Sequence, residues 1–435
     1  MLRTFPKGGI HPADNKISAD RPIEELPLPK VVSIPISQHI GAPAEIVVEK
    51  KQKVKVGDII ATAKGYVSSN IHATVSGVVT KIDTVLDSSG YKNPAVTIRV
   101  KDDEWIDTVD QGDEIIREFE LTQEEIVRKI MEAGIVGLGG AAFPSHVKLA
   151  PPKDKKADIL IVNGVECEPY LTADHRLMIE KPEHILVGID ILKKALGVEK
   201  VGIGVEANTP DAVKIFQQLT KGRKDIEVYP LKVKYPQGGE KQLIKAVTGE
   251  EVPAGGLPID VGAIVHNVGT VYAVYEAIQK NKPLVERIVT VTGKNLENPS
   301  NFRVRIGTPV SDIIEAAGGL PEDAGKIING GPMMGKALSD VTVPITKGTS
   351  GILIIPEAEG RRGEVKSCIR CSRCVSVCPM GLEPYLLMTL IEKKFDDRAK
   401  DEDIFDCIEC GSCNYICPSH RPLLDYIRLG KKVLK

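Results

Sequence analysis

The sequence has little net charge and no long apolar run. Its 57 Lys and Arg nearly balance 59 Asp and Glu, which gives a formal net charge of -2 and argues against a general nucleic-acid-binding protein. No stretch reaches the roughly 18 uninterrupted apolar residues of a membrane span. The best candidate, residues 261–278, is interrupted by His266, Asn267 and Glu276. The chain is therefore predicted not to cross a bilayer by itself.

Aromatic residues are also scarce at 4%, whereas 40 glycines and 29 prolines predict many turns and close backbone approaches. The first residues lack the apolar core of a secretory signal, which predicts a reducing, cytoplasmic compartment. Cysteines in such a compartment serve as ligands more often than as disulfides. Eight of the nine cysteines lie between Cys368 and Cys417, while Cys167 stands apart and is interpreted as a small buried residue.

Composition changes along the chain divide it into five predicted parts. Residues 1–30 contain five prolines and are predicted to form an extended arm. Residues 31–115 consist of short β-rich runs separated by turns. Within them, VKVGDIIA and IHATVSGVV resemble the barrel-sandwich hybrid of biotinyl and lipoyl domains. The expected hairpin tip, residues 65–69, has no lysine to modify, so we interpret this part as a domain without a swinging arm.

Helical and strand patterns alternate over residues 120–282, which predicts an α/β domain. A capping box starts this part at Thr122 with Glu125, and DILIVNGV, VGIGVE and AIVHNV are typical of buried parallel strands. Residues 284–356 resemble the soluble-ligand-binding β-grasp fold, and a polar linker leads to a helical cysteine module at residues 364–425. The predicted fold class is thus multidomain, with a Rossmann-like α/β domain, two β-rich domains and a cluster module.

The cysteine module contains two copies of the motif C-x2-C-x2-C-x3-C-P. In two-cluster ferredoxins the fourth cysteine of each run ligates the other cluster, because it must reach the iron that the first three cannot. Two [4Fe-4S] ligand sets are therefore predicted: Cys368, Cys371, Cys374 and Cys417, and Cys378, Cys407, Cys410 and Cys413. Structural zinc is the alternative, but it gives the third cysteine and the trailing proline no role. The acidic residues between the runs are interpreted as a solvated face or as a docking site for a basic redox partner.

A glycine-rich segment, GIVGLGGAAFPSHVKL, follows the first predicted helix of the α/β domain. Gly137, Gly139 and Gly140 would let backbone N–H groups approach a phosphate without hindrance from a Cβ atom. Such a turn is a weak signal alone. It gains weight because NGVECEP, YPQGGE and VHNVGT follow it, with polar side chains at the expected carboxyl ends of parallel strands, where open α/β sheets bind nucleotides.

These four motifs resemble those of the flavin-binding domain in the NADH-oxidising subunit of respiratory complex I. With the other domains and the phrases GGIHP and QHIGAPAE, the whole chain resembles the C subunits of Rnf ion-translocating electron transport complexes. The resemblance implies FMN contacts from Gly137, Gly139, Gly140, Lys148, Asn163, Tyr235, Gly238, Asn267 and Thr270. It also implies that Glu166, Glu168 and Glu240 line the isoalloxazine and nicotinamide pocket. Leu138, Val165, Gly239 and Gly269 depart from the complex I pattern.

The resemblance implies a subunit that moves electrons between NAD(H), FMN, two [4Fe-4S] clusters and a ferredoxin or ferredoxin-like partner. NAD(H) exchanges two electrons at once and clusters pass one, and a flavin with a stable semiquinone can join these steps. The other Rnf subunits would hold the chain peripherally at the cytoplasmic side of the plasma membrane, and no nucleic acid is expected as a partner. Two alternatives stay open at this point: a flavo-iron-sulfur cobalamin reductase, and a flavin-free electron relay or scaffold.

Overall fold

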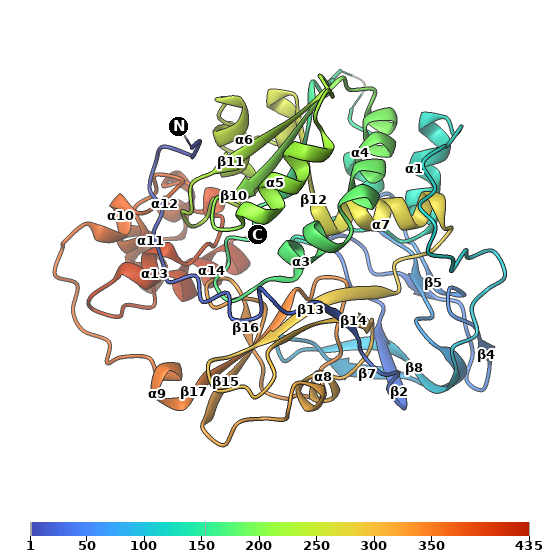
Figure 1. Cartoon of the computed structure of the whole chain (residues 1–435). Coiled ribbons are helices and arrows are strands. Elements are labelled where there is room, and N and C mark those ends of the chain that lie inside the picture. Colours follow the sequence, from blue (N-terminus) through green and yellow to red (C-terminus); the bar gives the residue numbers. More distant parts are fainter. Residues whose placement is uncertain (1, 153, 435) are drawn as a thin grey trace.

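The computed structural model describes residues 2–152 and 154–434. Figure 1 shows an α/β domain at the top, the cluster module beside it, and two β-rich domains below and to one side. The N-terminal arm runs along three of these parts. No helix in the described ranges is long and apolar enough to span a membrane.

The barrel-sandwich domain consists of two small antiparallel sheets. One has the order β2-β8-β7-β4 and the other β3-β5-β6. Their strands are β2 (Val31–Pro35), β3 (Glu45–Ile46), β4 (Lys53–Val54), β5 (Ile59–Thr62), β6 (Ile71–His72), β7 (Ser76–Leu86) and β8 (Lys92–Asp102). Alternate side chains such as Val32, Ile34 and Ile98 point inward and are fully buried, as expected for strands with one face in a core.

The α/β domain has a four-stranded parallel sheet in the order β11-β10-β9-β12. Its strands are β9 (Ile159–Gly164), β10 (Lys200–Glu206), β11 (Ile226–Leu231) and β12 (Ala263–Asn267). Around them lie α1 (Gln123–Glu132), α2 (Ser145–Lys148), α3 (Ala173–Glu180), α4 (Pro182–Leu196), α5 (Pro210–Leu219), α6 (Glu240–Thr248), the 3-10 helix η1 (Pro258–Val261) and α7 (Val268–Gln279). The predicted capping box at Thr122 is present, with Glu125 as its second member.

The third domain is a six-stranded mixed sheet in the order β1-β14-β13-β17-β15-β16. Its elements are β13 (Glu286–Thr292), β14 (Ser300–Arg305), α8 (Val310–Ala316), β15 (Ala324–Asn329), β16 (Lys336–Ala337), β17 (Gly351–Pro356) and α9 (Glu357–Gly360). The edge strand β1 (Ile23–Glu25) comes from the N-terminal arm and pairs in parallel with β14. The arm therefore completes a sheet whose other strands lie far along the chain.

The cluster module is built from short helices around the eight cysteines. They are α10 (Arg373–Ser376), α11 (Pro384–Glu392), α12 (Asp396–Asp401), the 3-10 helix η2 (Ile404–Asp406), α13 (Ser412–Ile416) and α14 (Leu423–Val433). The arm passes between this module and the α/β domain (Figure 1), where Gly9 N donates to the Val377 carbonyl and Ile10 pairs with Tyr235.

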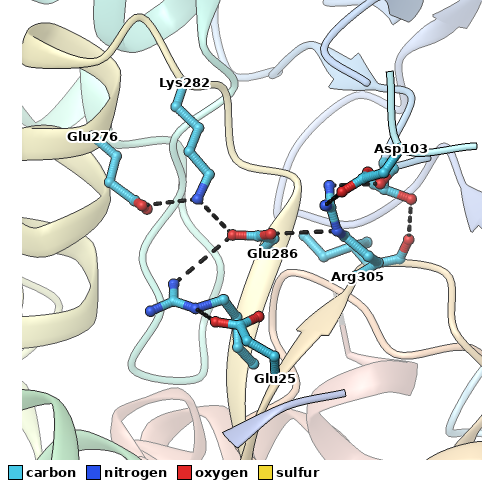
Figure 2. A network of polar contacts seen from close by, with 9 residues as sticks. Glu25, Asp103, Glu276, Lys282, Glu286 and Arg305 are labelled. Atoms are coloured by element: carbon cyan, nitrogen blue, oxygen red, sulfur yellow. Dashed lines mark hydrogen bonds and ion pairs between the residues drawn. The ribbon is translucent and has the colours of Figure 1, made fainter. Parts of the chain in front are cut away.

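A network of buried charges joins the domains where α7 meets β13 and β14 (Figure 2). Glu286 lies at its centre, 2.5 Å from Lys282 Nζ and 3.3 Å from Arg305 Nε. The outer partners are Glu276 of the α/β domain, Asp103 of the barrel-sandwich domain and, through Arg303, Glu25 of the arm. One ionic network thus fixes three domains and the arm relative to one another.

Candidate flavin and cluster sites

The candidate flavin site lies at the point where the strand order of the parallel sheet reverses. Successive strands β9, β10 and β11 extend the sheet to one side, and β12 then adds to the other side of β9. Ligands of open α/β sheets bind in the crevice at such a point, outside the carboxyl ends of the strands. Asn163, next to the last residue of β9, lies in register with Asn267, which ends β12. Two of the predicted flavin residues, Asn163 and Asn267, therefore lie at this crevice.

The two asparagines hold the surrounding loops. Asn163 Nδ2 donates to the Gly238 carbonyl at 2.9 Å, which ties β9 to the loop before α6. Asn267 accepts a hydrogen bond from Gly269 N as the N-cap of α7 and donates to Asp174 Oδ2 at 2.6 Å. Both side chains thus shape the loops of the site.

The glycine-rich loop presents unpaired backbone donors beside this crevice. Gly137 N and Leu138 N are hydrogen-bonded, the latter to Thr270 Oγ1 at 2.9 Å. The N–H groups of the next four residues, 139–142, donate to no acceptor in the described part of the chain, and residues 139–141 are exposed. A Cβ atom on Gly139 would lie 3.2 Å from that of Asn267, while Gly140 has a φ of +118° and open space around it.

A positive side chain approaches the same edge of the sheet. Lys148 ends the short helix α2, and its Nζ lies 2.7 Å from Glu240 Oε1 and 3.1 Å from the Val265 carbonyl. Glu240 is the first residue of α6, so the lysine links the start of this helix to β12. A loop with free N–H groups, followed by a helix that ends in a lysine, suits the phosphate of a flavin mononucleotide. The residues present therefore fit FMN.

Glu166 and Glu168 are held by backbone donors. Glu166 accepts from Asp174 N and His175 N in the first turn of α3, and Glu168 accepts from Met333 N and Met334 N of the third domain. Burial raises the pKa of each carboxyl group to about 7. Their expected contacts with the flavin ring and the nicotinamide stay a prediction, because the present partners are the α3 turn and the residue 333–334 loop.

Tyr235 connects the α/β domain to the cluster module. Its ring is 2% exposed, and its hydroxyl group donates to the Cys410 carbonyl at 2.7 Å. Ile10 of the arm packs in the same small apolar cluster, with Cys167 and Met333 at its margin. Burial raises the pKa of Cys167 well above its usual range, which agrees with the interpretation of this thiol as a packing residue.

Neighbouring thiols in the cluster module come from both sequence runs, as the two predicted sets require. Burial, followed by the charges of Cys417 and Cys368, raises the pKa of Cys374, so these three thiols are neighbours. Cys413 is influenced in the same way by Cys410, Cys407 and Cys378. We call Cys368, Cys371, Cys374 and Cys417 the outer set, and Cys378, Cys407, Cys410 and Cys413 the inner set.

This grouping across the two sequence runs fits the crossed ligation of two [4Fe-4S] clusters. A cube binds each thiolate at a different iron, so its ligands need not converge on one point. Within the described ranges, no three Cys, His, Asp or Glu side chains are placed to hold a single metal ion. The ligand sets themselves stay a prediction that variants can test.

Two supporting residues of the site have no signal in the sequence. Lys16 of the arm donates to the carbonyl groups of Glu166, Glu168 and Leu171 and so holds the segment after β9. Arg287 of β13 is 7% exposed and donates to the Leu138 carbonyl in the glycine-rich loop. Both act over long sequence separations, where no local spacing identifies a partner.

Four family models match the chain in the order of its domains. They are the RnfC barrel sandwich hybrid domain (residues 4–104), the Nuo51 FMN-binding domain (130–276), the SLBB domain (288–337) and the 4Fe-4S dicluster domain (362–418). These matches confirm the predicted fold class and the predicted cofactor types. Together with the geometry above, they define a flavin- and iron-sulfur-containing electron-transfer protein.

Similar proteins identify the family. The chain is 47% identical to the C subunit of the proton-translocating ferredoxin:NAD(+) oxidoreductase complex of Clostridium ljungdahlii, over 99% of this chain and 94% of that protein. It is 42% identical to the C subunit of the Na(+)-translocating complex of Acetobacterium woodii, over 98% and 96%. An NAD+-reducing [NiFe]-hydrogenase structure is 17% identical with a TM-score of 0.49, covering 72% of this chain and 63% of that one. The chain belongs to the RnfC family, the C subunits of ion-translocating oxidoreductase complexes.

Proposed function

We propose that this chain carries electrons between NAD(H) and a ferredoxin-type partner as part of a membrane-bound ion-translocating complex. The 47% and 42% identical relatives are C subunits of ferredoxin:NAD(+) oxidoreductase complexes, and the present chain aligns with them over nearly its whole length. The flavin-binding and dicluster domains provide the carriers that this reaction needs. The other subunits of such a complex are its partners, and they couple electron flow to ion movement.

The observation that carries this proposal is that one α/β domain contains both the glycine-rich loop with free N–H groups and Tyr235, which contacts the inner cluster set. Free N–H groups of residues 139–142 and the Lys148 ammonium group favour a phosphate at the crevice. Tyr235 then leads from the same domain to Cys410 through a direct hydrogen bond. When bound, FMN supplies the exchange between two-electron and one-electron chemistry.

We assign the flavin phosphate to Gly137, Gly139, Gly140 and Lys148, and the walls of the site to the remaining predicted residues: Asn163, Tyr235, Gly238, Asn267 and Thr270. Glu166, Glu168 and Glu240 are proposed to face the ring and the nicotinamide when both are bound. Each of these carboxyl groups has a partner that binding can replace, such as Lys148 for Glu240. We propose that these carboxyl groups leave their present partners when the flavin and the nicotinamide bind.

The inner set is proposed to receive electrons first and the outer set second. Cys378, Cys410 and Cys413 are at most 9% exposed, whereas Cys368 and Cys371 are exposed. An inner cluster beside Tyr235 therefore lies between the flavin site and an outer cluster that a partner can approach. We place the chain on the cytoplasmic side of the plasma membrane, held there by the other subunits of the complex.

Anaerobically purified protein tests the proposal through its flavin, iron and sulfide content and through bleaching of the flavin band by NADH. Gly139→Val should release FMN, because a branched side chain fills the approach beside Asn267, and it should keep the iron of both clusters. Gly360→Val is the control, since a Cβ there makes an ordinary contact at 3.6 Å in α9. Glu168→Gln should keep FMN but slow its reduction by NADH. Wild-type protein without flavin, or with FMN that NADH does not reduce, would show that the chain only relays electrons.

A further inference from the structure

The loop that leads into the cluster module is exposed over its whole length. All residues from 361 to 373, here called the docking loop, are exposed, and Cys368 and Cys371 of the outer set lie within it. Lys366 N donates to the Ser419 carbonyl at 3.0 Å, and Ser419 Oγ donates back to the Ser367 carbonyl. These bonds hold the loop next to Cys417, so the whole outer set borders one open surface.

The docking loop has positive charge without matching acids. Arg361 and Arg362 at its start are paired with Glu357 and Asp425. In contrast, its three remaining cations form no ion pair with any described residue: Lys366, Arg370 and Arg373. Glu364 is the single acid of the loop. The surface around Cys368 and Cys371 is therefore locally positive, although the chain as a whole has a net charge of -2.

Apolar side chains lie among these cations. Val365 is 56% exposed and Ile369 is 67% exposed, on either side of Cys368. Tyr385 at the start of α11 is 38% exposed and lies near Cys374 and Cys368. Apolar contacts surrounded by charged residues are typical of protein interfaces, and small interfaces of this kind are common in electron transfer.

We infer that the docking loop is the binding surface for an acidic one-electron iron-sulfur carrier protein. Positive residues around an exposed cluster attract a negatively charged partner and orient it, while Val365 and Ile369 provide the apolar contact. One electron passes between the reduced cluster of the carrier and the outer cluster, and no bond forms or breaks. This inference rests on the proposed function, since it names the surface through which that function meets its partner.

The acidic residues of α12 and η2 lie elsewhere. Asp406 Oδ1 accepts a hydrogen bond from Gly255 N, so this acid of η2 contacts the α/β domain. The sequence left open whether these acids bind a basic redox partner. The docking loop, which contains the exposed outer cysteines, instead has an excess of positive residues. This excess favours an acidic partner at that surface.

Binding of the anaerobic holoprotein to a purified acidic bacterial ferredoxin tests the inference by titration calorimetry at several salt concentrations. Because the net charge of the chain is -2, its overall charge would weakly repel an acidic protein, and added salt would then tighten binding. Local attraction at the docking loop gives the opposite result: Kd should rise steadily as salt is added. This measurement needs no variant.

The combined variant Lys366→Gln, Arg370→Gln and Arg373→Gln should weaken binding about tenfold at low salt and flatten the salt dependence. The control variant, Lys50→Gln, Lys53→Gln and Lys101→Gln, neutralises three exposed lysines of the barrel-sandwich domain that form no ion pair within residues 2–152 and 154–434. It should bind as the wild type does. Iron and sulfide content confirm that the clusters are retained in both.

Two results would overturn the docking surface: a wild-type Kd that is constant or falls with added salt, or equal Kd values for the loop variant and the control. NADH bleaching of the flavin is measured on the same samples. If it succeeds while the Kd values are equal, the proposed function stands and the docking loop is wrong. If it fails while salt and loop charge still control binding, the docking loop stands and the NADH-linked role is wrong.

Discussion

Replacing Glu286 by glutamine tests the ionic network that joins the domains. The side chain of Glu286 is 10% exposed and faces Lys282, Arg303 and Arg305. Glu286→Gln keeps the shape but leaves these buried cations without their central anion, which should cost about 3–5 kcal/mol. Divided by the unfolding entropy expected for 435 residues, this loss of unfolding free energy lowers Tm by about 3–6 °C.

Scanning calorimetry of the anaerobic holoprotein measures this shift. Glu25→Gln is the matched control, because Glu25 binds Arg303 in the same network but is 74% exposed; it should change stability by at most about 1 kcal/mol. Arg287, the residue after Glu286, contacts the glycine-rich loop, so Glu286→Gln should also weaken FMN retention. Equal Tm shifts for the two variants would refute the reasoning.

The pH dependence gives the same test a second readout. Burial alone would raise the pKa of Glu286, but the charges of Lys282, Arg305 and Arg303 outweigh it and hold that pKa below the ordinary 4.5. A carboxyl group whose pKa is lowered in the folded state stabilises the protein at pH values above its ordinary pKa. This contribution is lost as the pH falls through the folded-state pKa. The Tm difference between wild type and Glu286→Gln should therefore be full at neutral pH and shrink below pH 4.5. A difference that is constant across this range would contradict the ionic origin.

Three further outcomes are expected. Cys417→Ser should alter the cluster of Cys368, Cys371 and Cys374 and leave the other cluster normal by electron paramagnetic resonance; damage to the inner set alone would exclude crossed ligation. Tyr235→Phe removes the donor to the Cys410 carbonyl and should shift the midpoint potential of the inner cluster only, which a redox titration resolves; equal shifts in both clusters would argue against it. Burial lowers the pKa of Lys347 to about 7, so wild-type stability should rise with pH from about 7 toward the unfolded pKa of about 10.4. Lys347→Met should abolish this rise in a pH series of urea midpoints, and an unchanged slope would show that another group causes it.

Local sequence patterns predicted the chemistry of this chain well, because the chemistry depends on short spacings. The two cysteine runs indicate two clusters, because the spacing of the cysteines matches the distances between the irons of a cluster. Gly137, Gly139 and Gly140 indicate a backbone that a phosphate can approach. The glycine-rich loop has free N–H groups beside the reversal of strand order, while the ligand roles of these residues stay a prediction. The capping box at Thr122 is equally local and is present.

Contacts over long sequence separations were not predictable in this way. Lys16 stabilises the segment of Glu166 and Glu168 from about 150 residues away, and one lysine in a proline-rich arm has no periodicity. The motif of Glu168 implies a role only by resemblance, which stays a prediction, and it does not predict the hydrogen bonds to Met333 N and Met334 N. Those donors belong to another domain, and only the packed structure brings them together.

The N-terminal arm has a consequence for synthesis of the chain. Glu25 lies 278 positions before Arg303, its partner, and ribosomes add about 5–20 residues per second. The segment made first therefore waits about 14–56 s for the strand that it must join. Until then β1 of the arm has no strand to pair with, and the bond from Gly9 to Val377 forms later still. Docking of the arm is thus a late step that requires the domains it contacts to be made first. A nascent chain truncated before residue 300 lacks β14, so the arm has no strand to pair with.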